Sequence, residues 1–447
     1  MPAKLRIWSP FCVGFLCLLQ SAPVVIAQEA IPQDSEQVYV DPIIELLDSG
    51  DVSQAVTAVE RSWEGQYEDY FAADLADVTL AADEIAATLA RLSAQTSQPT
   101  APIYAIPKPQ QLELILLLPG GTPKRFTVDV AAEQLRGAAR NLGRSTQYPS
   151  NDDYLEPAQQ LYDWLVRPLA DELVTAEIDT LMFCLGGGLR SLPLGVLHDG
   201  NRFLVERFSH ARIPGFNLMQ TSYTPLQKAL VLAMGASQFA TEVPLPAVPV
   251  EIEAVASTRL DRTFLNSGFT IRTLQQELGF IPYRIVHLAT HARFESGTAS
   301  ESYVQFWNER LTLDRLREIP WGDASVELLV LSACQTAIGD RDAELGIARL
   351  ALQAGVNTAI ASLWSVSDTG TLALMSEFYA QLQQAPTKSE ALRRAQLALL
   401  QGQVRVERGE LRGSTCGLEL PPELAELGGE FSHPFYWAAF TAIGSPW

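Results

Sequence analysis

The sequence predicts an α/β protein with a mostly parallel sheet, helices on both faces and a small helical region in front. The alternation of two apolar patterns along the chain supports this fold class. From residue 111 onward, short apolar runs of strand length alternate with amphipathic runs of helical length. Strands joined through helices usually run parallel and are buried on both faces. The apolar runs are 112–118, 179–185, 284–289, 327–331 and 358–363, and the helical patterns are 131–142, 155–167, 344–354 and 369–383.

The first residues resemble a secretory signal peptide over residues 1–27. Lys4 and Arg6 precede an apolar run that is too short to span a membrane, and small residues end at Ala27. We therefore expect an exported protein, periplasmic or extracellular, with an uncleaved N-terminal anchor as the alternative. No other stretch of the sequence has the composition of a membrane span.

The rest of the chain before the sheet divides by composition. Residues 28–41 are polar and indicate a flexible lead-in. Residues 42–93 have the apolar spacing of a helical hairpin, which could bind a protein partner or dock on the following domain. Residues 94–110 contain several prolines and predict a linker. The α/β domain is then expected over 111–447.

Charge and cysteine content exclude several functional classes. The chain has 32 Lys and Arg against 52 Asp and Glu, a net charge of −20, so it has no basic footprint for nucleic acid. Three cysteines lie beyond residue 27, namely Cys184, Cys334 and Cys416. An odd number excludes a complete disulfide framework, although a Cys184–Cys416 bridge stays open. The histidines and cysteines lack metal-ligand spacing, so no metal or other cofactor is expected.

Two of the predicted strands end in residues that could perform chemistry together. One strand leads into His291 and another into Cys334. Parallel neighbours would place both at one sheet edge, where the imidazole could take the thiol proton. The backbone N–H groups of Ala292 and Cys334 could then face a developing oxyanion. Taken singly, each residue is more often an ordinary buried side chain, so the pair and its flanking residues carry the hypothesis.

The flanking motifs resemble the CHAT-domain branch of caspase-like cysteine peptidases, which is akin to separase. The resemblance covers roughly residues 110–447. In order along the chain, the matching segments are 189–199, His287–His291, Leu331–Thr336, 344–346 with 355–357, 361–368, and a predicted closing strand at 433–440. Such a series of ordered motifs is far more specific than a lone cysteine and histidine.

This resemblance implies a caspase-like fold with His291 and Cys334 as the catalytic dyad. It also implies that Trp364 and Asp368 line the substrate pocket, with a preference for Lys or Arg before the cleaved bond. For Asp368, a helix N-cap is an equally good alternative, since a helical pattern follows directly. The family usually has glycine where this chain has Ala292, a change that restricts the backbone.

The sequence therefore predicts an exported cysteine endopeptidase that acts on protein or peptide substrates. The alternative from another class is a catalytically silent caspase-like module that binds peptides. Intact His291 and Cys334 favour the enzyme, whereas Ala292 and an oxidising location favour the module.

Overall fold

The computed structural model describes residues 42–71, 79–257, 262–294, 300–321, 326–332, 335–336, 354–414, 417–425 and 429–447. The predicted signal peptide 1–27 and lead-in 28–41 lie outside these ranges. So do Cys334, Cys416 and all but the last residue of the predicted helix 344–354.

The largest sheet in the described part of the chain has 11 strands. In order across the sheet they are β3 (Lys124–Val128), β2 (Leu112–Leu116), β1 (Thr100–Pro107), β4 (Thr180–Leu185), β5 (Ser209–Arg212), β19 (Phe440–Gly444), β14 (Thr358–Ser362), β12 (Leu328–Ser332), β8 (Ile285–Ala289), β6 (Val231–Gly235) and β7 (Arg262–Leu265).

Neighbouring strands of this sheet run mostly parallel. The antiparallel pairings are β3 with β2, β2 with β1, and β19 with β14. Because β19 is antiparallel to β14 and parallel to β5, the two halves of the sheet point in opposite directions. The carboxyl ends of β6, β8, β12 and β14 therefore share one edge, where ligands of such sheets usually bind.

The predicted apolar runs correspond to β2, β4, β8, β12 and β14. Three of the predicted helices are α4 (Ala132–Ser145), α5 (Leu155–Leu165) and α11 (Asp368–Leu382). The expected α/β fold class, a mostly parallel sheet with helices on both faces, is confirmed.

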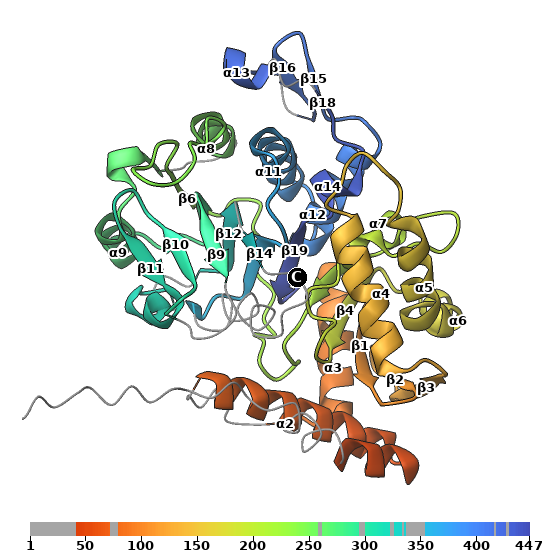
Figure 1. The fold of residues 1–447 in the computed structure, drawn as a ribbon. Helices are drawn as coiled ribbons and strands as arrows, with labels where there is room; N and C mark the ends of the chain where they lie inside the picture. The colour runs from red at the N-terminus through yellow and green to blue at the C-terminus, as the bar shows by residue number, and fades with distance from the viewer. Residues whose placement is uncertain are drawn as a thin grey trace, which may run out of the picture.

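Side chains of β1, β2 and β4 alternate between two cores. Ile103, Leu114 and Phe183 belong to the main core, which includes α4 and α5. Their neighbours Tyr104, Ile115 and Cys184 belong to a second core with α2 (Val52–Phe71) and α3 (Ala82–Thr96). This period of two is what a strand buried on both faces requires. Residues 42–48 are also helical, and Figure 1 shows α2 and α3 at one end of the molecule.

The prediction of a linker over 94–110 is wrong. Residues up to Thr96 complete α3, and Thr100–Pro107 form β1, which pairs with β2 and β4. Proline suggested a loop, but Pro102 precedes the antiparallel register with β2, which begins at Ile103. Pro102 has no N–H to donate back to Leu117, but its carbonyl accepts from Leu117 N at 3.2 Å, so the proline removes a single hydrogen bond at the end of this pairing.

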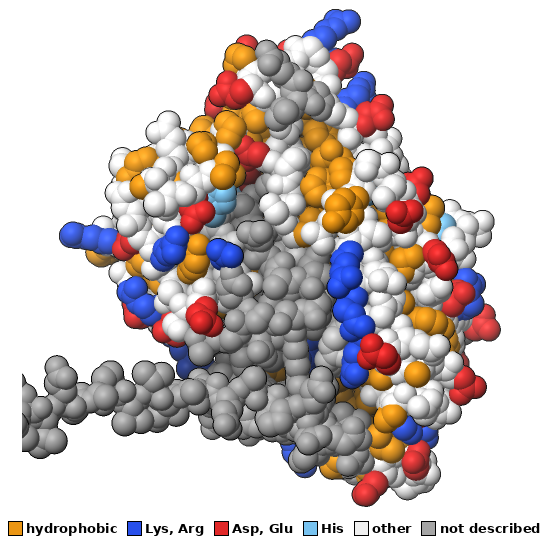
Figure 2. All heavy atoms as spheres, in the orientation of Figure 1, with side chains coloured by type: hydrophobic (Ala, Val, Ile, Leu, Met, Phe, Trp, Pro, Cys, Tyr) orange, Lys and Arg blue, Asp and Glu red, His pale blue; other side chains and the backbone are white. Residues whose placement is uncertain are grey.

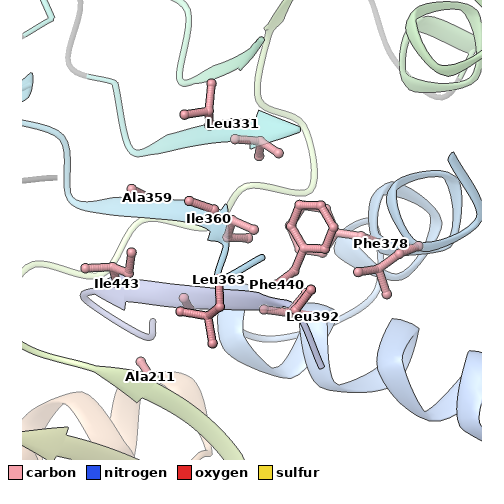
Figure 3. Close-up of a cluster of buried hydrophobic side chains, with 14 of the residues drawn as sticks. Ala211, Leu331, Ala359, Ile360, Leu363, Phe378, Leu392, Phe440 and Ile443 are labelled. Carbon is pink, nitrogen blue, oxygen red and sulfur yellow. The ribbon is translucent and has the colours of Figure 1, made fainter. Parts of the chain in front are cut away.

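The other half of the sheet is covered by α11 and α12 (Lys388–Leu400). Figure 3 shows Phe378 of α11 and Leu392 of α12 beside Phe440 of β19 and Ile360 of β14. These four side chains are at most 3% exposed. This packing fixes α11, whose first residue is Asp368, against the strands that lead to the site.

The predicted closing strand at 433–440 needs a correction. Residues Pro434–Trp437 form the short helix α14, and the strand β19 begins only at Phe440. His433 caps this helix, because its side chain accepts a hydrogen bond from Phe435 N at 3.0 Å. Proline at the first position suits a helix start as well as a strand start.

Smaller elements complete the described fold. One four-stranded sheet consists of β11 (Arg310–Thr312), β10 (Tyr303–Gln305), β9 (Ala292–Phe294) and β13 (Gln335–Thr336), and another of β17 (Leu418–Glu419), β16 (Glu410–Arg412), β15 (Arg405–Glu407) and β18 (Gly429–Glu430). The remaining α-helices described are α6 (Ala170–Thr175), α7 (Leu204–Arg207), α8 (Val248–Ser257), α9 (Ile271–Phe280) and α13 (Pro422–Ala425). Among the helices described, none has the length and apolar character to cross a membrane.

Candidate active site

The two strands that lead to His291 and Cys334 are parallel neighbours. In their register Leu331 is opposite Leu288, and Ser332 is opposite Ala289. His291 follows Ala289 by two residues, and Cys334 follows Ser332 by two. The expectation that both strands end at one edge is confirmed, although Cys334 itself lies outside the described residues.

The ring of His291 is held by a backbone carbonyl. Its Nε2 lies 2.7 Å from the carbonyl oxygen of Val243, and the ring of Phe239 packs beside it at 4.8 Å between centroids. A carbonyl oxygen can only accept, so Nε2 carries the proton. In the neutral ring this leaves Nδ1 as the acceptor, the atom that could take a proton from a thiol.

Ala292 begins β9, immediately after His291. Gln305 N donates to the carbonyl of His291 at 2.8 Å, and Val304 is opposite Ala292. In an antiparallel pair the hydrogen-bonded positions alternate, so the N–H of Ala292 points away from β10. On that other side β9 pairs with β13, where Gln335 is opposite Arg293.

Alanine in place of the family's usual glycine causes no backbone strain here. In the described part of the chain the non-glycine residues with positive φ are Ser97, Glu177, Asn266 and Arg408. Ala292 instead has ordinary strand backbone and is 5% exposed. An N–H donor at this position therefore needs no conformation that only glycine adopts.

A cavity of about 130 Å³ opens beside His291. It is lined by residues from β9 and β10, from the end of β12, from the chain after β14, from the connection between β6 and α8, and from α8 and α11. They are Glu242, Leu245, Val248, Glu251, His291, Ala292, Arg293, Tyr303, Ser332, Ser365, Val366, Asp368 and Thr371. The cavity thus brings together His291, Ala292 and Asp368, three of the residues that the sequence singled out.

Asp368 is the first residue of α11, and its carboxylate faces this cavity. The helix cap is its neighbour Ser367, whose hydroxyl accepts from Gly370 N at 3.0 Å. The N-cap alternative for Asp368 is therefore wrong by one residue. Its Oδ2 accepts from Ala247 N at 2.6 Å. Burial, together with the charge of Glu251, raises the pKa of Asp368 to about 6, against the opposing effect of the Ala247 hydrogen bond.

Trp364 lies in the core and is not among the residues that line this cavity. Its side chain is 1% exposed, and its indole N–H donates to the carbonyl of Phe435 at 3.1 Å. This contact ties the end of β14 to α14, which is a packing role.

The connection between β6 and α8, residues 236–247, was not singled out from the sequence. It supplies the Val243 carbonyl to His291 and the Ala247 N–H to Asp368. Gly235 lets this connection begin close to β8, since a Cβ there would lie 2.6 Å from the carbonyl oxygen of Ala289. Backbone groups have no sequence signature, so their role could only be found from the structure.

Two further carboxylates in the cavity were also missed. Glu242 pairs with Arg310 at 3.1 Å, and Glu251 is 1% exposed. Glu251 did leave a signal, because it shares one face of α8 with the buried Val248, Ile252 and Val255. A charge on an apolar helix face indicates a buried partner. In the described part of the chain, no cluster of three or more His, Cys, Asp or Glu side chains could hold a metal ion.

Solved structures similar to this chain include a separase and RgpB. The Saccharomyces cerevisiae separase in its complex with securin has a TM-score of 0.49 and 9% identity, covering 89% of this chain and 34% of that chain. Porphyromonas gingivalis RgpB, in a complex of its pro- and mature domains, has a TM-score of 0.37 and 10% identity, covering 70% of this chain and 75% of that chain. This chain spans about a third of the separase chain. Similarity at this level carries no inference about activity.

No curated protein is significantly similar to the chain in sequence. The CHAT domain family, by contrast, matches residues 155–445, more than half of the chain. This match includes the strand ends, the cavity and α11, and it confirms the resemblance that the motifs indicate. The chain therefore belongs to the CHAT domain family, with its caspase-like fold.

Proposed function

We propose that this protein is a cysteine endopeptidase in which Cys334 is the nucleophile and His291 the general base. The observation that supports it best is the register of the strands on either side of Cys334. Ser332, two residues before it, is opposite Ala289, and Gln335, directly after it, is opposite Arg293. Consecutive Cα atoms are about 3.8 Å apart and paired strands about 4.8 Å apart. We therefore expect the thiol of Cys334 within reach of the His291 ring.

The chemistry follows from the tautomer of His291. Nδ1 takes the proton of the Cys334 thiol, and the thiolate attacks the carbonyl carbon of the peptide bond. The N–H groups of Ala292 and Cys334 stabilise the oxyanion. The imidazolium then protonates the leaving amine, which leaves a thioester on Cys334. Water, deprotonated by the same imidazole, hydrolyses the thioester and releases the acid.

The charge of the cavity supports a preference for Lys or Arg before the cleaved bond. Asp368, Glu242 and Glu251 line it, and Asp368 is ionised above about pH 6. A guanidinium or ammonium group entering this site would pair with the Asp368 carboxylate. A neutral side chain would leave that buried carboxylate without a counter-charge, which disfavours its binding.

We further propose that the protein is exported through a signal peptide at residues 1–27. The charge and apolar pattern of that segment support this, and the N-terminal sequence of the mature protein would test it. The apolar faces of α2 and α3 are buried against the sheet. A protein partner of the N-terminal helices would therefore bind their outer faces.

The decisive experiment is cleavage of a mixed peptide library by the mature chain beside a Cys334→Ala control. Cleavage that disappears in the control, with cuts after Lys or Arg, would support the peptidase and its acidic pocket. Cuts after other residues would keep the peptidase and reject the role of Asp368. If neither chain cleaves while both bind peptides, the chain is the peptide-binding module instead.

A further inference from the structure

A cluster of buried polar side chains lies directly behind the cavity. Glu251 of α8 accepts a short hydrogen bond from the hydroxyl of Ser332 at the end of β12. The same oxygen, Oε1, lies 3.0 Å from Nε2 of His287 in β8, a carboxylate–imidazole contact outside hydrogen-bond geometry. On its other side, Nδ1 of His287 lies 3.2 Å from the hydroxyl of Tyr379 in α11.

Burial of this cluster is unfavourable, because its polar groups lose their hydration. Glu251 is 1% exposed, His287 is fully buried, and Ser332 is 2% exposed. A carboxylate in such a place destabilises the fold unless its partners compensate for the lost hydration. Apolar side chains could fill the same space, as they do at Val248 and Val255 on the same face of α8. A polar cluster kept at this position therefore calls for a reason beyond packing.

The location of the cluster supplies that reason. It links the four elements that hold the candidate site. β8 leads to His291, β12 leads to Cys334, α8 follows the connection that binds His291, and α11 begins with Asp368. The charge of Glu251 also raises the pKa of the Asp368 carboxylate at the start of α11. Glu251 itself touches both strands, at Ser332 of β12 and at His287 of β8.

We propose that Glu251 is a positioning residue for the reactive pair. Its carboxylate holds Ser332 at the end of β12 and His287 inside β8. It thereby fixes the distance between the two strand ends that lead to Cys334 and His291. The inference rests on the proposed function. Ser332 precedes Cys334 by two residues and His287 precedes His291 by four. A displacement of about 1 Å between reacting groups can lower a rate about 100-fold.

The test measures the thiol of Cys334 rather than turnover. Alkylation by iodoacetamide, followed at the Cys334 peptide by mass spectrometry from pH 5 to 9, reports the thiolate that His291 stabilises. The variants are Glu251→Gln, Ser332→Ala and their double variant, with His291→Ala as reference. Glu253→Gln is the matched control, because Glu253 is an exposed glutamate on the same helix.

We expect Glu251→Gln to lower the alkylation rate at pH 7 by about 10- to 100-fold and to move its pH profile toward that of His291→Ala. Ser332→Ala should act in the same direction, and the double variant should lose no more than the larger single loss. Glu253→Gln should have the same alkylation rate and pH profile as the unchanged chain. Where cleavage is measurable, kcat should fall with KM nearly constant.

Three results would overturn the inference. The first is alkylation in Glu251→Gln with the rate and pH profile of the unchanged chain. The second is additive losses in the double variant. The third is an unchanged rate in His291→Ala, since there would then be no coupled pair to position. If Glu251→Gln does not fold, Ser332→Ala decides alone, because it removes only one hydroxyl. A chain that cleaves nothing but shows the expected alkylation would reject the proposed function and keep this inference.

Discussion

Asp368 shows how its surroundings change an ordinary carboxylate. In the unfolded chain it should ionise near its usual value of 3.8, whereas burial raises the pKa in the folded protein to about 6. The folded protein therefore binds this proton more tightly than the unfolded chain. The stability that this group contributes is present below about pH 4 and is lost as the pH rises through about 6.

We expect Asp368→Asn to raise the free energy of unfolding at pH 7 by about 1–3 kcal/mol, because the amide stays neutral and its oxygen can still accept from Ala247 N. At pH 4 the variant and the unchanged chain should be nearly equal. Urea unfolding at both pH values measures this. A gain of the same size at pH 4 and 7 would show that ionisation is not its cause.

His291 illustrates a different residue-scale effect, in which a backbone group sets the state of a side chain. The Val243 carbonyl can accept only from an N–H, so it selects the tautomer with Nδ1 free. The side chain of Val243 is 73% exposed and contributes nothing to this contact. A substitution of Val243 should therefore change the tautomer of His291 less than a change in the backbone path of the connection between β6 and α8.

Among the elements, α2 is attached to the sheet by one buried carboxylate. Glu60 accepts from Tyr104 Oη at 2.7 Å, from Phe216 N at 2.9 Å and from Asn217 N at 3.0 Å. Burial raises the pKa of Glu60 despite these hydrogen bonds. The contacts join α2 to β1 and to the chain that follows β5.

Glu60→Ala should lower the free energy of unfolding by about 2–4 kcal/mol, because it leaves a buried hydroxyl and two N–H groups without their acceptor. Glu60→Gln should lower the free energy of unfolding by less, because the amide oxygen can still accept some of these hydrogen bonds. Denaturant unfolding gives both values. Arg61→Ala, at an exposed position of the same helix, is the control and should change little. An equal, small loss in all three variants would mean that Glu60 does not hold α2.

At the scale of the whole molecule, the 11-stranded sheet has a core on each side of β1, β2 and β4, and α2 and α3 complete one of these cores. The second core joins α2 and α3 to Tyr104, Ile106, Ile115, Leu117, Met182 and Cys184. Figure 2 shows that the outer surface mixes basic and acidic side chains, with a line of basic ones in the area where Figure 1 draws α4. Arg136, Arg140 and Arg144 repeat at every fourth position of that helix.

A chain that begins at Pro99, without α2 and α3, should aggregate because one face of β1, β2 and β4 would meet water. A chain that begins at Pro42 is the matched control and should remain folded. Size-exclusion chromatography and thermal unfolding of both chains test this. A monomeric chain from Pro99 with a cooperative transition would show instead that α2 and α3 are a separable unit.

The sequence by itself determined the alternation of strands and helices, the two strands that end in His291 and Cys334, and the family. These depend on apolar periodicity and on short motifs, both of which involve residues close together in the sequence. Only the tertiary structure decided that 100–107 is a strand, that the Val243 carbonyl fixes the His291 ring, and that Ala247 and Glu251 surround Asp368. Those contacts join residues 48 to 121 positions apart, often through backbone atoms that every residue type carries. No local pattern encodes them, because folding alone brings such groups together.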